Sequence, residues 1–353
     1  MRLLITGCAG FIGSALARHA VLELGWSVVG VDAMTYAATR GAIATLEGHR
    51  RFELVLGDVT DAGAMAALFA DAQPEAVAHL AAETHVDRSI DNPEAFLSAN
   101  VVGTHRVARA ALAYRDRLGG AAAERFRFLH VSTDEVFGTL GPEGAFTEAS
   151  ACAPRSPYAA SKAAADHFVR AFHETYGLPT IISNCSNNYG PFQFPEKLIP
   201  LTILNGLEGR PLPLYGDGLQ VRDWIAVEDH VAALALILER GVVGETYLVG
   251  ARNEQTNKAV VETLCGALDR LRPESAPHAR LITLTADRPG HDRRYAIDPT
   301  KIERTLGFKP QAAFEERLAA TVSWYADNAE WWQPLRARYT GTRLGLPTAQ
   351  GAA

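Results

Sequence analysis

The chain has 353 residues, of which 48% are hydrophobic and 21% are charged, as in an ordinary globular protein of one or two domains. Its formal net charge of −6 disfavours nucleic acid and anionic membranes as partners, and no apolar run approaches the roughly 20 residues that span a bilayer. The start, MRLLITG, reaches a glycine too early for a signal peptide, and the four cysteines lack C-x-x-C spacing. We therefore expect a cytoplasmic protein with free thiols.

The first half of the chain alternates apolar, strand-like runs with longer alanine-rich stretches of helical character. Continuous apolar strands separated by helices indicate a parallel sheet covered on both faces, and right-handed crossovers then give a doubly wound fold. The predicted strands are Leu3–Thr6, Ser27–Val31, Phe52–Leu56, Ala76–Leu80, Phe128–Ser132 and Thr180–Asn184. The predicted helices between them include Ile12–Leu24, Ala62–Ala70 and Pro93–Tyr114.

After Asn184 the alternation of strand-like and helical segments ends. The run NYGPFQFPEKLIP is rich in proline and aromatic residues and is predicted to be irregular. Helices are expected over Val227–Arg240 and Ala259–Leu271, with a strand over Glu245–Val249. The pattern predicts an α/β protein, a Rossmann-type doubly wound parallel sheet with a smaller mixed α/β substrate lobe. The expected dinucleotide-binding domain is 1–185, with about 222–250 returning to it; the lobe is 186–221 and 251–335, and 341–353 is a frayed tail.

A glycine-rich segment, TGCAGFIG, places Gly7, Gly10 and Gly13 between the first strand and the first helix. Glycines there let the backbone approach a pyrophosphate at a helix N-terminus, although an ordinary strand-to-helix turn is the alternative. Asp32 ends the second strand, where an acid accepts hydrogen bonds from a ribose 2′-OH and favours NAD over NADP. Asp58 ends the third strand, close to the expected adenine position, or else caps the next helix.

Tyr158 and Lys162, in SPYAASKAAADHF, lie four residues apart, so they share one helix face if Pro157 begins the helix. A tyrosine beside an ammonium loses its proton more easily and can act as a base on an alcohol. A surface lysine is the alternative. Asp134 and Glu135, in STDEVFG, stand side by side where a buried strand should end, at a cost in desolvation. The alternative for this pair is a solvated strand end.

Taken together, these residues resemble the dTDP-glucose 4,6-dehydratase family of extended short-chain dehydrogenases/reductases, over roughly residues 1–330. This chain departs from the residues usual in the family at four positions, which are Cys8, Thr84, Phe137 and Ala226. The resemblance implies tightly held NAD, a homodimer, and a nucleotide-diphosphate sugar in the second lobe. It rests on TGCAGFIGS, HLAAETHVDRSI, NVVGTHRV, STDEVFG, SPYAASKAAADH, SNNYGPFQFPEKLIP, RDWIAVEDH and DRPGHDRRYAID.

The resemblance also implies a reaction. Hydride leaves C4 of the sugar while Tyr158 takes the O4 proton, Glu135 then removes the C5 proton, Asp134 protonates the departing C6 oxygen, and hydride returns to C6. Thr133 is implied as a hydrogen-bond partner of O4, and Lys162 as the companion of Tyr158. Asp134 must then hold a proton in the working state, which burial beside a second carboxylate would favour.

Further contacts are implied in both sites. The cofactor residues, besides Tyr158 and Lys162, are Gly7, Gly10, Phe11, Ile12, Gly13, Asp32, Ala33, Met34, Thr35, Asp58, Val59, Leu80, Ala81, Ala82, Ala99 and Asn188. The substrate residues, besides Thr133, are Thr84, Asn187, Glu196, Lys197, Leu198, Pro213, Tyr215, Arg222, Asn257, Asp287, Arg288 and His291. Arginine suits phosphate through its paired donors, although Arg293 and Arg294 could instead pair with local acids. His79, His85 and His130 lack metal-ligand spacing, and no metal is expected.

Three other functions remain open. The nearest is a 4,6-dehydratase of another nucleotide sugar. A C4 epimerase needs only tyrosine, lysine and NAD, so the acid pair argues against it. A non-enzymatic NAD-sensing protein on the same fold could dispense with both the tyrosine and the acids.

Overall fold

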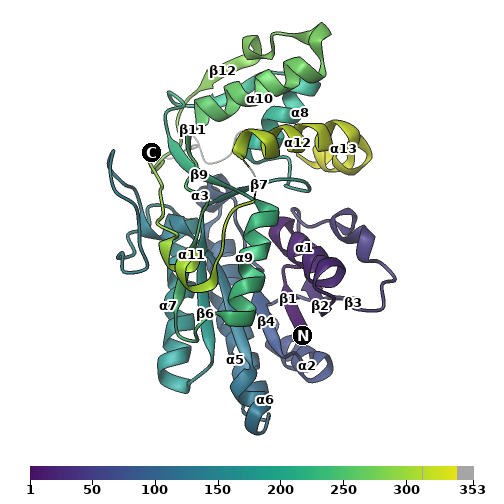
Figure 1. Cartoon of the computed structure of the whole chain (residues 1–353), viewed down its shortest axis with the longest axis vertical. Helices are drawn as coiled ribbons and strands as arrows, with labels where there is room; N and C mark the ends of the chain where they lie inside the picture. The colour runs from purple at the N-terminus through teal and green to yellow at the C-terminus, as the bar shows by residue number, and fades with distance from the viewer. Residues whose placement is uncertain (312, 340–353) are drawn as a thin grey trace, which may run out of the picture.

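A seven-stranded sheet forms the centre of the protein in a computed structural model that describes residues 1–311 and 313–339 (Figure 1). The strand order is β10-β6-β5-β4-β1-β2-β3, and every neighbouring pair is parallel. The predicted tail, 341–353, lies outside the described residues. The strands are β1 Arg2–Thr6, β2 Ser27–Asp32, β3 Phe52–Leu56, β4 Ala76–His79, β5 Arg127–Thr133, β6 Thr180–Cys185 and β10 Thr246–Val249. The predicted doubly wound parallel sheet is confirmed.

Helices cover both faces of this sheet, which is why its strands are apolar throughout. One face packs against α1 (Phe11–Arg18), α9 (Val227–Arg240) and α11 (Thr300–Leu306). The other face packs against α2 (Ala62–Ala72), α5 (Thr104–Arg115) and α7 (Pro157–Tyr176). The strand order reverses between β1 and β4, and in such folds ligands bind at the carboxyl ends of the strands beside that point.

Two predicted helices are continuous but change their pitch. The predicted helix Ile12–Leu24 is α1 followed by a π-helical turn over His19–Glu23. The predicted helix Pro93–Tyr114 is α4 (Pro93–Phe96), a π-helical stretch over Leu97–Gly103, and then α5. Apolar periodicity shows which face of a segment is buried, but it does not distinguish these neighbouring pitches.

A second group of elements lies above the sheet in Figure 1. It holds two small sheets, of strand order β11-β9-β7 and β12-β8. Within the described part of the whole chain, no helix is long and apolar enough to cross a bilayer. The strands are β7 Asn187–Tyr189, β8 Leu212–Tyr215, β9 Val221–Ala226, β11 Glu254–Thr256 and β12 Ile282–Thr285. The helices are α8 Leu198–Leu207, α10 Asn257–Leu271, α12 Phe314–Asp327 and α13 Ala329–Arg338, with α3 Val86–Asp91 and α6 Gly120–Arg125 elsewhere.

The prediction that residues 188–200 are irregular is wrong at both ends. Its first residues belong to β7, which pairs with β9, a strand more than thirty residues later. Its last residues begin α8, where Pro200 sits in the first turn and so removes no helical hydrogen bond. Short strands held by distant partners leave no local pattern in the sequence.

Candidate active site

The glycine loop forms a cradle at the carboxyl end of β1. Gly7 has φ +71, and a Cβ atom there would lie 2.8 Å from the Ala81 nitrogen. A Cβ atom on Gly13 would lie 2.0 Å from the Gly7 oxygen. Because no side chain fits at either position, the loop presents bare backbone at the N-terminus of α1, as a pyrophosphate requires.

Asp32 closes the same cradle from the end of β2. Its Oδ2 accepts the Ala9 amide at 2.9 Å, and its Oδ1 accepts the Met34 amide at 2.8 Å. Burial raises the pKa of this carboxyl, while these two hydrogen bonds lower it. The acid is thus held beside the glycine loop with acceptor capacity left on each oxygen, which suits a ribose diol.

A groove of about 520 Å³ runs along these strand ends. All the predicted cofactor residues line it except Met34, whose amide instead holds Asp32. Asp58 lines it as well and accepts the Thr60 amide at 2.8 Å. The helix cap proposed as an alternative for Asp58 belongs to Asp61, which caps α2.

Helix α7 carries a buried polar stripe toward the sheet. The helix begins at Pro157, as predicted, after the N-cap Ser156. Tyr158, Lys162 and Asp166 follow at intervals of four and are all buried. The Lys162 ammonium donates to the Val131 carbonyl at 2.8 Å.

The pKa of Tyr158 is raised well above its ordinary value, chiefly by burial and then by Glu135 and Cys185. This differs from the expectation that Lys162 would lower it. The main reason is burial of the phenol, to which the Glu135 carboxylate adds, while the Lys162 ammonium is directed at a backbone carbonyl. A hydrogen bond to Thr133 works in the opposite direction and lowers the pKa of Tyr158.

A supporting amide behind the site was missed from the sequence. The Asn184 side chain on β6 donates one proton to the Thr133 carbonyl and the other to Asp166, each at 3.0 Å. Its two donors thereby join the end of β5 to the stripe on α7. The distance in sequence between these residues hid the network, since only the pairing of β5 with β6 brings them together.

The two acids at the end of β5 have different surroundings. Asp134 is 1% exposed and begins a 3₁₀ turn over Asp134–Phe137. Burial, Glu135 and Asp223 raise its pKa well above 3.8. Burial also raises the pKa of Glu135, but its neighbouring charges are mainly cations that lower it, first Arg288, then Arg222 and Lys197. Unequal environments of this kind suit one carboxyl to hold a proton and the other to accept one.

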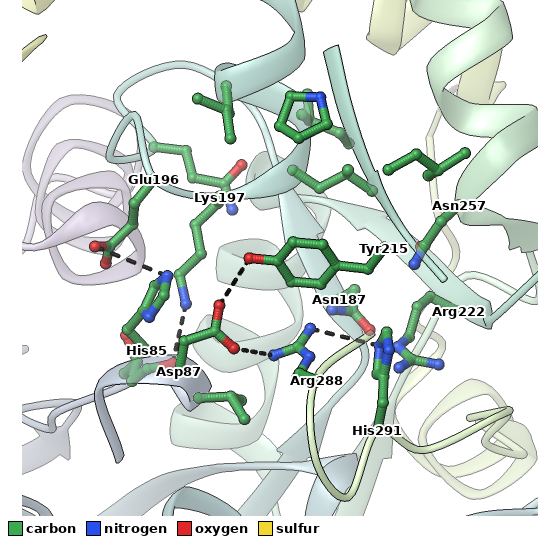
Figure 2. Close-up of a pocket in the computed structure, with 18 of the residues that line it drawn as sticks. His85, Asp87, Asn187, Glu196, Lys197, Tyr215, Arg222, Asn257, Arg288 and His291 are labelled. Atoms are coloured by element: carbon green, nitrogen blue, oxygen red, sulfur yellow. Dashed lines mark hydrogen bonds and ion pairs between the residues drawn. The ribbon is translucent and has the colours of Figure 1, made fainter. Parts of the chain in front are cut away.

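A second cavity, of about 320 Å³, lies beside the groove (Figure 2). It is lined by eleven of the thirteen predicted substrate residues; the others are Thr133, which lines the groove, and Asp287. Asp287 accepts His291 Nδ1 at 2.6 Å and the Arg288 amide at 2.9 Å, so it supports two residues of the cavity wall. The groove and the cavity share Thr84, Glu135, Asn187, Asn188, Gln193, Glu196 and Lys197.

Three cations face this second cavity from three elements. Lys197, at the start of α8, donates to the Thr84 carbonyl at 2.9 Å. Arg222, on β9, is 6% exposed and donates to two backbone carbonyls. Arg288 follows β12, and burial lowers the pKa of its neighbour His291 to about 4, so that imidazole is neutral at pH 7.

Two other arginines of the same loop have surface partners. Arg293 binds Asp217 at 2.9 Å and Arg294 binds Glu254 at 2.6 Å, as the alternative reading predicted. His79 and His130 are buried in the core. His85 instead lines the second cavity. Among the described residues there is no cluster of potential metal ligands.

Asp134→Asn is expected to stabilise the protein at neutral pH. The folded-state pKa of Asp134 lies above its unfolded value. The wild-type protein therefore loses stability as the pH rises from the unfolded-state pKa to the folded-state pKa of this carboxyl. The variant cannot ionise, so it does not lose this stability. We expect thermal denaturation at pH 8 to show a melting temperature higher by about 2–4 °C. The difference in melting temperature between variant and wild type should become smaller as the pH falls.

The control is Asp217→Asn, at an exposed acid whose pKa is lowered by Arg293, which should not raise the melting temperature. An unchanged melting temperature in Asp134→Asn would contradict a raised pKa of Asp134.

The fold and the site define a Rossmann-type enzyme of the extended short-chain dehydrogenase/reductase class, in which a dinucleotide groove opens into a second cavity. The model of the GDP-mannose 4,6 dehydratase family matches residues 4–321. The chain belongs to this family of nucleotide-sugar 4,6-dehydratases.

Curated relatives are similar in sequence to this chain over nearly its whole length. It is 53% identical to dTDP-glucose 4,6-dehydratase 1 of Escherichia coli, over 94% of each chain, and 51% identical to the dTDP-glucose 4,6-dehydratase of Neisseria meningitidis, over 98% of this chain and 99% of the other. The solved dTDP-glucose 4,6-dehydratase of Streptomyces venezuelae, with NAD bound, superposes with a TM-score of 0.88 at 44% identity, covering 95% of this chain and 100% of that one. A UDP-glucose 4-epimerase of Thermus thermophilus superposes with a TM-score of 0.82 at 27% identity, covering 93% of this chain and 100% of that one.

Proposed function

We propose that the protein is an NAD-dependent dTDP-glucose 4,6-dehydratase, a hydro-lyase that forms dTDP-4-keto-6-deoxyglucose. The observation that carries the proposal is the acid pair of buried Asp134 and half-buried Glu135, which have opposite electrostatic surroundings; Glu135 lines both cavities. The relatives named dTDP-glucose 4,6-dehydratase, at 51–53% identity, support the choice of nucleotide sugar.

The groove fits a dinucleotide through its bare glycine cradle and through Asp32, whose charge repels a 2′-phosphate. Bound NAD supplies an acceptor for the C4 hydride and a donor that returns it to C6. Tyr158 accepts the O4 proton, and Thr133, whose hydrogen bond lowers the pKa of Tyr158, orients that oxygen. Lys162 supplies a positive charge on the same face of α7.

The 4-ketone makes the C5 hydrogen acidic, and the acids complete the elimination. Glu135 removes the C5 proton, because Arg288, Arg222 and Lys197 favour its charged form. Asp134 gives its proton to the departing C6 oxygen, because burial and two acids keep it protonated. Water leaves, C6 regains the hydride, and C5 regains a proton, which Glu135 at the junction of the two cavities is placed to return, so the net reaction is redox neutral. An epimerase has no use for this acid pair, which disfavours that function.

We also propose the surroundings in which the enzyme works. Residues 1–185, with about 222–250, bind the cofactor, and residues 186–221 with 251–335 bind the sugar nucleotide. Four free cysteines support a reducing, cytoplasmic setting. A homodimer is supported by large apolar side chains left exposed around α5 and α7, namely Leu97, Val102 and Phe168.

The test is turnover of dTDP-glucose by the purified protein with NAD and without added reductant. In deuterated water we expect one solvent deuterium at C5 of the keto product, and the C4 hydride at C6 of the same molecule. UDP-, CDP- and GDP-glucose, tested in parallel, should each turn over at least tenfold more slowly than dTDP-glucose. A different base would leave some polar groups of the substrate cavity without their hydrogen-bond partners. The proposal fails if no keto sugar forms, or if a C4 label crosses between substrate molecules.

A further inference from the structure

Asp87 is a buried acid in the wall of a cavity that otherwise collects cations. The residue lies in α3 and is 4% exposed. Its Oδ2 accepts the Tyr215 hydroxyl at 3.0 Å, and its Oδ1 accepts Arg288 Nη1 at 3.3 Å (Figure 2). Tyr215, Arg288 and Asp87 all line the second cavity. A buried carboxylate is costly unless it is paired in this way.

The two partners of Asp87 come from neighbouring strands outside the central sheet. Tyr215 ends β8, and Arg288 follows the end of β12, which pairs with β8 in parallel. Asp87 reaches them from α3, in the chain that follows β4 of the central sheet. One carboxylate therefore fixes two side chains from the ends of two strands and joins that sheet to the first half of the chain.

Arg288 depends on this contact more than the other two cations do. Arg222 stands within β9 and Lys197 at the start of α8, and both donate to backbone carbonyls. Arg288 lies in a loop, and Asp87 is the carboxylate that its guanidinium contacts among the described residues. Its Nη2 lies 3.5 Å from His291 Nε2, and its buried Nε has no hydrogen-bond partner in that same part of the chain. The guanidinium is thus oriented by Asp87 and keeps a donor available.

We propose that Asp87 is a positioning residue that holds Arg288 and Tyr215 in place for the nucleoside diphosphate part of the substrate. The proposal rests on the proposed function, since it assumes that the second cavity takes a nucleotide sugar. Asp87 lines the second cavity but not the cofactor groove, whereas Glu135 lines both, so Asp87 is placed away from the carbons that the cofactor must reach. Loss of Asp87 should therefore weaken binding and spare the chemical steps.

Asp87→Asn tests the proposal, because an amide keeps the size of the side chain but offers one acceptor to two donors and no charge. We expect the Kd of dTDP, measured by calorimetry on the NAD-loaded enzyme, to rise about tenfold or more, as for loss of a charge-assisted pair. We expect KM for dTDP-glucose to rise equally, with kcat within about twofold of wild type. Tyr215→Phe removes one of the two donors and should raise the Kd by a smaller factor.

The matched control is Asp217→Asn, which removes a carboxylate from an exposed pair with Arg293 and should leave the Kd unchanged. A Kd within about twofold of wild type in Asp87→Asn overturns the proposal. So does a fall in kcat with unchanged KM. If Asp87→Asn does not fold, an unchanged Kd in Tyr215→Phe overturns it instead. Failure of the wild-type enzyme to bind dTDP would count against the proposed function itself.

Discussion

Glu135→Gln is expected to lower kcat by about 10²–10⁴-fold, the usual contribution of a positioned general base, while still allowing C4 oxidation. Glutamine keeps the shape of the side chain at the junction of the two cavities but cannot take the C5 proton. Because Tyr158 and Thr133 are untouched, hydride should leave C4 and remain on the cofactor. Mixing the variant with dTDP-glucose should therefore produce the absorbance of reduced nicotinamide with little keto product.

The control for this variant is Glu143→Gln, at an exposed acid shortly after the same turn. It should turn over like wild type. Normal turnover of Glu135→Gln would show that another group is the base. Loss of both the reduced-nicotinamide signal and the product, with dTDP binding intact, would mean that Glu135 acts before elimination.

Tyr158→Phe is expected to stop the reaction one step earlier. Phenylalanine keeps the buried ring but removes the oxygen that accepts the O4 proton, so C4 oxidation itself should fall by about 10³-fold or more. No reduced nicotinamide should accumulate in single-turnover measurements. Combined with Glu135→Gln, the double variant should show the phenotype of Tyr158→Phe, because the blocked step comes first.

Tyr176→Phe, at the exposed end of the same helix, is the matched control and should be as active as wild type. Substantial accumulation of reduced nicotinamide by Tyr158→Phe would exclude Tyr158 as the proton acceptor. The two variants together separate oxidation from elimination, which an assay of product alone does not.

Two departures from the family pattern have a simple structural setting. Phe137 lies just after the acid pair, and its ring packs 5.2 Å from that of Phe146 within a buried apolar cluster. Ala226 is buried at the end of β9, beside Tyr189 of β7. Neither residue lines either cavity, so both substitutions fall in the apolar core behind the candidate site.

The central sheet, the glycine loop and the candidate catalytic residues could be predicted from the sequence. The strands were predictable to within one residue at each end, and helix Val227–Arg240 to the residue, because a buried parallel strand must be apolar along its whole length. Tyr158 and Lys162 were predictable because a helix brings residues four apart together. These features depend on neighbours in the chain, which local patterns record.

The difference between the two acids and the contacts that hold the second cavity together depend on residues brought together by the fold. Arg222 and Arg288 reach Glu135, and Asp223 reaches Asp134, from elements far along the chain. Tyr215 and Arg288 meet Asp87 only because β8 pairs with β12. Electrostatic effects on a pKa act through space and at short range. The order of residues could place the pair at a strand end, and the family resemblance implied that Asp134 holds the proton. The charges that make the two acids differ could be found only in the fold.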